Sequence, residues 1–100
     1  MTDITCQELK ERMDKGENLI IIDVREVHEF EEFNIGAQLI PLGEIPYKLD
    51  ELAHLKNEEI ILHCRSGNRS GNAKMFMMEN GFTNVRNLLG GMIEWREKFA

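Results

Sequence analysis

Two short runs of apolar, mostly β-branched residues constrain the fold of this chain more than any other feature. Leu19-Ile20-Ile21-Ile22 is one run, and Ile60-Ile61-Leu62 lies within the other, which spans residues 59–63. Such continuous apolar runs are typical of strands buried on both faces of a parallel sheet. A shorter strand is predicted at Leu39-Ile40, because the following Pro41 favours an extended residue before it. A last strand is predicted within residues 84–89.

Amphipathic segments separate these strands and predict helices. Thr5 and Glu8 have the spacing of a capping box, and Ile4 and Leu9 have that of a hydrophobic staple. The first helix should therefore begin after Thr5 and end at Gly16. Further helices are predicted over residues 26–33, 42–55, 70–81 and 92–99. Pro46 should lie in the first turn of the helix over residues 42–55, and Ser70 should be the N-cap of the helix that ends at Gly81. Strands that alternate with helices predict βαβ crossovers and an α/β fold with a parallel sheet.

Length and charge exclude several classes of protein. One hundred residues suffice for one hydrophobic core, so we expect residues 1–100 to form a single domain. The formal net charge of -6 argues against nucleic acid or an anionic membrane surface as a partner. No apolar run approaches the length of a membrane span, and residues 1–5 lack the features of a signal peptide. We therefore expect a location in the reducing cytoplasm.

The chain has two cysteines, Cys6 and Cys64. Their spacing fits no zinc pattern, so we predict no metal and no cofactor. Counting alone leaves a Cys6–Cys64 disulfide open, although such a bond would consume the candidate nucleophile. Cys6 lies on the first predicted helix, and we interpret it as an ordinary cysteine, with a resolving thiol as the alternative.

Cys64 opens the segment Cys64-Arg65-Ser66-Gly67-Asn68-Arg69-Ser70, between a predicted strand and a predicted helix. A cysteine in that position faces a helix N-terminus, and the helix dipole favours the thiolate. Gly67 and its small neighbours allow successive amide N–H groups to point inward and bind an anion. Arg65 and Arg69 add positive charge. We therefore predict that Cys64 is a sulfur nucleophile in an anion-binding loop, with a lowered pKa.

This loop has two alternative interpretations besides a sulfur nucleophile. A free cysteine is often only a small buried apolar residue, and such cysteines are inert. A cysteine phosphatase has a similar loop, but five residues separate its cysteine from its arginine. Here four residues lie between Cys64 and Arg69, so the smaller ring suits a single sulfur atom better than a phosphoryl group.

With these residues in view, the chain resembles the single-domain rhodanese (thiosulfate sulfurtransferase) family. The loop from Cys64 to Ser70 resembles the active-site loop of that family, and Asp23-Val24-Arg25 with Glu29-Phe30 resembles its first signature. Other matching residues are Ile40-Pro41-Leu42, Gly81-Phe82, Val85, Leu88, Gly90-Gly91 and Trp95. The resemblance implies a three-layer α/β/α domain with a central five-stranded parallel sheet. One departure is Phe33-Asn34-Ile35-Gly36-Ala37, which lacks a histidine and a variable residue that the family usually has there.

The resemblance also implies an activity and its site residues. Cys64 would be the catalytic residue, and a Cys64 persulfide would carry a sulfane sulfur from thiosulfate, or a similar anionic donor, to cyanide, a thiol or a protein acceptor. The substrate-binding residues would be Arg65, Ser66, Gly67, Asn68, Arg69 and Ser70. A non-catalytic partner-binding module is the main alternative, although modules of that kind commonly lose the cysteine. A phosphatase or arsenate-reductase-like enzyme is a further alternative.

The remaining side chains of interest are assigned either a structural role or a role in binding the donor. We favour a structural role for Arg69 and donor binding for Arg65, and we expect Arg25 to pair with Asp23 or Glu29. Strand alternation sends His63 to the face opposite Cys64, where a packed histidine is expected. Core packing is predicted for Trp95 and for Met75, Met77 and Met78.

Overall fold

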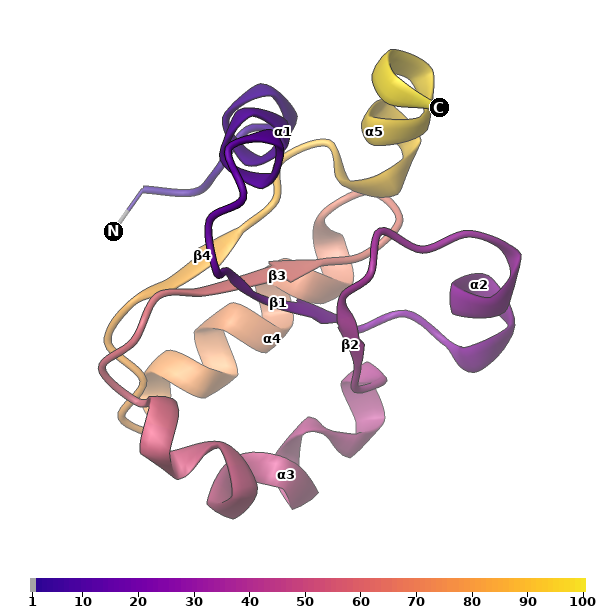
Figure 1. Ribbon diagram of the computed structural model, residues 1–100. Coiled ribbons are helices and arrows are strands. Elements are labelled where there is room, and N and C mark those ends of the chain that lie inside the picture. Colours follow the sequence, from indigo (N-terminus) through magenta and orange to yellow (C-terminus); the bar gives the residue numbers. More distant parts are fainter. Residues whose placement is uncertain (1) are drawn as a thin grey trace.

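The computed structural model describes residues 2–100, which form a parallel four-stranded sheet between two layers of helices (Figure 1). The strands are β1 (Ile20–Asp23), β2 (Gln38–Leu39), β3 (Ile60–His63) and β4 (Val85–Asn87), and their order in the sheet is β2-β1-β3-β4. The strand β3 lies in the interior of the sheet, paired with β1 and β4 on its two sides. The predicted α/β fold with a parallel sheet is confirmed.

The sheet has four strands, not the five that the family resemblance implied. Ile4 occupies the place of a fifth strand beside β4, but it forms only a single parallel bridge with Leu88. The pairing ends after one residue because the next residue, Thr5, already belongs to the start of α1 (Cys6–Asp14). Its side chain caps that helix by accepting a hydrogen bond from the Glu8 N–H. The chain thus turns into a helix directly after one paired residue.

Helices cover both faces of the sheet, and alternation along β3 separates the two cores. Ile60, Leu62 and Cys64 face one core, which α3 (Ile45–Leu52) and α4 (Asn68–Glu79) close. Ile61 faces the other core, which α1 and α5 (Gly91–Phe99) close, with Trp95 buried as predicted. The short helix α2 (Val27–Glu32) buries no residue and lies at the side of the molecule (Figure 1).

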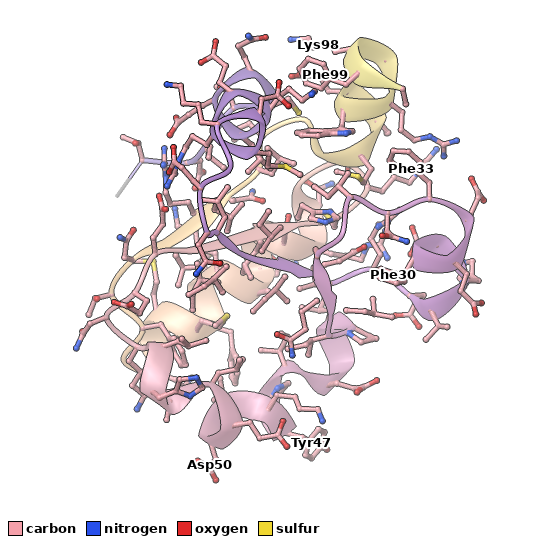
Figure 2. All side chains as sticks on the ribbon, viewed as in Figure 1. Phe30, Phe33, Tyr47, Asp50, Lys98 and Phe99 are labelled. Atoms are coloured by element: carbon pink, nitrogen blue, oxygen red, sulfur yellow. The ribbon has the colours of Figure 1, made fainter. Side chains whose placement is uncertain are left out.

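The predicted helix over residues 42–55 is divided into three segments. A 3-10 turn (Leu42–Glu44) precedes α3, and a second one (Ala53–Leu55) follows it. Pro46 lies in the first turn of α3, as predicted, and its missing N–H accounts for the 3-10 turn that precedes this helix. The Ile45 N–H bonds to the Leu42 carbonyl instead, which is the pattern of a 3-10 helix. Tyr47 points from this helix into solvent (Figure 2).

The helix α4 buries fewer methionines than predicted. Its buried side chains are Ser70, Ala73 and Met77, which recur at helical spacing on the face toward the sheet. Met75 is 65% exposed and Met78 is 42% exposed, so the prediction of core packing is wrong for both. Helical periodicity decides their position, because only one side of α4 contacts the sheet.

Candidate active site

Cys64 follows β3 directly, so it lies at the carboxyl end of an interior strand. Parallel α/β folds place their ligand sites at this edge of the sheet. The residue is only 1% exposed, and its side chain packs in the core beneath α4. The chain then turns through Gly67, whose φ of 107° is in the left-handed region, and enters α4 at Asn68. Glycine adopts this conformation without the strain that a side chain would add.

The sulfur of Cys64 accepts hydrogen bonds from the first turn of α4. The Gly67 N–H lies 3.1 Å from Sγ, the Ser70 N–H donor lies 3.4 Å from it, and the Ser70 hydroxyl lies at 3.3 Å. Burial raises the pKa of the Cys64 thiol, but the hydrogen bonds from Ser70, Gly67 and Ser66 favour the thiolate, and the net effect lowers this pKa below its ordinary value. The geometry therefore favours an ionised, nucleophilic sulfur.

Ser70 is not the N-cap of α4, contrary to the sequence prediction. Gly67 holds the N-cap position, and Ser70 is the third residue of the helix. The N–H groups of a first helical turn have no partner inside the helix, and a side-chain oxygen usually accepts one of them. In this protein the sulfur of Cys64 acts as the capping acceptor, because it accepts hydrogen bonds from the N–H groups of Gly67 and Ser70.

The two arginines of the loop lie in different surroundings. Arg69 forms two hydrogen bonds with the Glu29 carboxylate of α2, at 2.7 and 2.9 Å. This pairing, first among the causes, lowers the pKa of Glu29 to about 2. Arg65 forms no ion pair within residues 2–100, and it lines a pocket of about 210 Å³ between α2 and α5. Arg65 is therefore the loop arginine left available for an anion.

The start of α5 holds the loop from its other side. The Met92 N–H donates to the Cys64 carbonyl at 2.9 Å, and the Ile93 N–H donates to the Arg65 carbonyl at 3.0 Å. Gly91 precedes them with a φ of 53°, and a Cβ added there would lie 2.5 Å from the Arg65 carbonyl oxygen. The backbone of α5 can approach the loop this closely only because residue 91 has no side chain.

Three residues that support the loop were not predicted in these roles. The sequence indicates Glu29 as a family match and a possible partner for Arg25, Gly91 as a family match, and Asn87 as part of a predicted strand. Asn87 donates from Nδ2 to the Gly67 carbonyl at 3.0 Å and accepts from the Ser70 hydroxyl at 2.5 Å. The Gly90-Gly91 pair was the one sequence signal that could have indicated a close backbone approach.

A buried ion pair lies beside the nucleophile's strand. Arg25 donates to both carboxylate oxygens of Asp23, which is the pairing that the sequence predicted, and also to the Phe33 carbonyl at 2.6 Å. His63 is completely buried, as expected for a packed histidine, with Nε2 3.9 Å from Asp23. Burial, the largest cause, lowers the pKa of His63 to about 4, so the ring is neutral at physiological pH. The Arg96 guanidinium lies over the Phe33 ring, with Cζ 4.8 Å from the ring centroid, and this contact links α5 to the end of α2.

Cys6 and Cys64 are both free and buried, so the disulfide left open by the sequence is not formed. Burial is the largest cause of a rise in the pKa of the Cys6 thiol to about 11. A thiol in that state is not ionised near neutral pH and makes a poor resolving group.

The contrast between the two thiols predicts selective labelling. Native protein treated with limiting iodoacetamide at neutral pH should be alkylated once, at Cys64, because only Cys64 has a lowered pKa. Peptide mapping by mass spectrometry locates the label, and the denatured protein, which exposes both thiols, is the control. Equal labelling of Cys6 in the native protein would contradict the prediction.

Within residues 2–100, no three His, Cys, Asp or Glu side chains are grouped so that they could hold a metal ion. The helices of this same part of the chain are all too short or too polar to cross a membrane.

The fold and the loop together define a parallel α/β domain with a cysteine at the end of an interior strand, held in a ring of amide donors. Residues 5–98 match the family described as a rhodanese-like domain, and the chain belongs to that family. The family resemblance drawn from the sequence is therefore confirmed.

Similar proteins agree with this assignment. The chain is 40% identical over 94 residues to the putative sulfurtransferase YtwF of Bacillus subtilis, a match that covers 93% of this chain and 88% of YtwF. It is also 40% identical over 97 residues to the putative sulfur carrier protein YrkF of the same organism, covering 96% of this chain but only 51% of YrkF. The crystal structure of SSP1007 from Staphylococcus saprophyticus superposes with a TM-score of 0.87 at 34% identity, covering 99% of this chain and 97% of that one.

Proposed function

We propose that this protein is a sulfurtransferase that carries a sulfane sulfur on Cys64. The observation that supports this most directly is the Cys64 sulfur, which accepts hydrogen bonds from Gly67 and Ser70 and has a lowered pKa. The names of the relatives YtwF, a putative sulfurtransferase, and YrkF, a putative sulfur carrier protein, point to the same chemistry. The cytoplasm is the proposed location, because a reducing compartment keeps a single thiolate available.

The proposed reaction has two steps. The Cys64 thiolate attacks the outer sulfur of thiosulfate, a new S–S bond forms, and the old S–S bond breaks as sulfite leaves with its electron pair. The persulfide then gives its outer sulfur to cyanide, a thiol or a protein acceptor, and the Cys64 thiolate returns. Charge and electrons balance in both steps without a redox partner or cofactor. Such a covalent intermediate predicts ping-pong kinetics.

The loop residues would divide the work of binding. The amides of Ser66, Gly67 and Asn68 and the first turn of α4 would stabilise the negative charge of the donor and of the persulfide. Arg65, which lines the neighbouring pocket without an ion-pair partner within residues 2–100, would attract the anionic donor. We propose that Arg69 shapes the loop through Glu29 and contributes its charge from there.

The enclosure of Cys64 favours a small donor. Cys64 is 1% exposed, so a reagent must reach the sulfur with a narrow group. A terminal sulfur on a small anion meets this requirement, and so does a thiol at the end of a flexible protein segment. The site therefore fits thiosulfate-like donors, and it fits protein acceptors only through an extended end.

Intact mass spectrometry tests the proposal. After incubation with thiosulfate the protein should gain one sulfur atom, about 32 Da, and cyanide should remove it. A Cys64→Ser variant should show no gain, and a Cys6→Ser variant, which alters only the packed cysteine, should behave as the unaltered protein does.

A folded protein that alkylates at Cys64 but gains no mass would exclude thiosulfate as the donor. That result would favour either a different sulfur donor or the alternative function of a non-catalytic binding module. Release of phosphate from an aryl phosphate would instead favour the phosphatase alternative, against which the four-residue spacing argues.

A further inference from the structure

Asn87 lies in β4 with its side chain directed at the nucleophile's loop, and it is 8% exposed. Its side chain contacts the loop at two points, the Gly67 carbonyl at 3.0 Å and the Ser70 hydroxyl at 2.5 Å. The orientation of the amide follows from these partners. A carbonyl oxygen can only accept, so Nδ2 must face Gly67, and Oδ1 must then face Ser70.

The Ser70 hydroxyl has one proton and two neighbouring acceptors. Its oxygen lies 3.3 Å from the Cys64 sulfur and 2.5 Å from Asn87 Oδ1. Neither Asn87 Oδ1 nor a thiolate can donate a proton, so only one of them is bonded to the Ser70 hydrogen at a time. We propose that Asn87 is a positioning residue that competes with the Cys64 sulfur for the hydroxyl proton of Ser70. The role of this competition in catalysis rests on the proposed function of Cys64.

The competition separates the states of the sulfur. When Cys64 is a thiol, its S–H donates to the Ser70 oxygen, and Ser70 donates to Asn87, so every group has a partner. When Cys64 is a thiolate, the Ser70 hydrogen turns to the sulfur, and Asn87 Oδ1 loses its donor. Asn87 therefore stabilises the uncharged sulfur relative to the thiolate. In a persulfide the inner sulfur is again uncharged, and the Ser70 hydrogen returns to Asn87. Ser70 keeps its own proton throughout and only changes the direction of its O–H bond, while the proton that Cys64 loses on ionisation leaves from the sulfur.

The acidic groups Asp3 and Glu29 near the triad of Cys64, Ser70 and Asn87 have lowered pKa values, so they stay ionised above about pH 5. On the side of β4, Asp3 accepts from the Asn87 N–H at 3.0 Å and pairs with Lys74 of α4 at 2.6 Å, and the pKa of Asp3 is lowered. On the side of α2, Glu29 pairs with Arg69, and its pKa is lowered to about 2. The pKa of His63 is lowered to about 4, and that of Cys6 is raised to about 11. Between about pH 5 and pH 9 these groups do not mask the ionisation of Cys64.

A double-mutant cycle on ionisation tests the proposal. The pKa of Cys64 is measured from the ultraviolet absorbance of the thiolate and from the rate of iodoacetamide alkylation as a function of pH. Asn87→Leu should lower this pKa by roughly half a unit to one unit, because Ser70 then has only the sulfur to bond. Ser70→Ala should raise it. In the Ser70→Ala background, Asn87→Leu should cause no further shift.

The control variant is Asn84→Leu, at the residue just before β4. The buried Asn84 Oδ1 has no hydrogen-bond partner within residues 2–100, so this substitution should leave the pKa of Cys64 unchanged. An equal shift from Asn87→Leu in both backgrounds would overturn the proposal, since Asn87 would then act through the Gly67 carbonyl. No shift in either background would also overturn it.

If circular dichroism shows that Asn87→Leu does not fold, Asn87→Asp replaces it. Aspartate keeps the shape and offers a stronger acceptor, so the pKa of Cys64 should rise more in the Ser70 protein than in the Ser70→Ala protein. An equal rise would indicate charge alone and contradict the proposal. None of these measurements uses a sulfur donor, so their failure leaves the persulfide test of the proposed function unaffected.

Discussion

Replacing Gly91 with alanine should lower the free energy of unfolding by about 3 to 5 kcal/mol. Two separate effects contribute to this loss. The φ of 53° is strained for any residue with a side chain, and the new Cβ would lie 2.5 Å from the Arg65 carbonyl oxygen and 2.6 Å from that of Cys64. Both neighbours are backbone atoms, so relief requires the loop and the start of α5 to separate. Unfolding in denaturant measures the loss of stability, and the alkylation rate of Cys64 shows whether the loop around this residue has changed.

Gly16→Ala is the matched control for this substitution. Gly16 has a φ of 77°, but a Cβ there would meet nothing within 4 Å. This variant should therefore lose only the cost of the left-handed conformation, about 1 to 2 kcal/mol. If Gly91→Ala loses no more than Gly16→Ala, the close approach of α5 to the loop has no energetic importance, and the interpretation is wrong.

Acid should destabilise the protein through His63 before its carboxylates are protonated. The pKa of His63 falls from 6.5 in the unfolded chain to about 4 in the folded protein, and burial is the main cause. Below pH 6.5 the unfolded chain binds a proton that the folded protein rejects, so stability declines as the pH falls towards 4. At about 1.4 kcal/mol for each pKa unit, the loss by pH 4 approaches about 3 kcal/mol.

His63→Gln separates this effect from that of the acidic residues. Glutamine has no titrating group, so the free energy of unfolding, measured in denaturant at a series of pH values, should be nearly flat between pH 6.5 and about pH 4.5. The contribution of Glu29, whose pKa is lowered to about 2, is lost only below its ordinary value of 4.5. A variant that keeps the full decline above pH 4.5 would show that another group is responsible.

The sequence predicted the elements of this fold well where one local signal decided each of them. The apolar runs located β1 and β3, and Thr5 located the start of α1. The sequence did not predict the division around Pro46 or the exposure of Met75 and Met78. Composition marks methionine as apolar, but only the phase of α4 against the sheet decides which methionines are buried.

The sequence predicted the loop around Cys64, but it did not predict the side chains that hold this loop in place. The Glu29–Arg69 pair joins residues 40 positions apart, and Asn87 reaches Ser70 and Gly67 across 17 and 20 positions. These residues become partners because α2 and β4 pack beside the loop. The spacing of residues in the sequence does not reveal that packing. Glu8 shows the same limit, because its carboxylate bonds to Arg86 instead of completing the capping box predicted with Thr5.

The sulfur that caps α4 also bears on how relatives without the nucleophile can arise. Because Cys64 accepts N–H groups of the first helical turn, its loss removes a structural contact together with the reactive atom. Aspartate, asparagine and serine carry an acceptor at a similar distance from the backbone and are common capping residues at helix N-termini. A descendant with one of these residues at position 64 would keep a capped helix and an intact loop while its chemistry ended. Under the proposed function, one substitution at position 64 would thus separate a domain that transfers sulfur from a domain that only binds a partner.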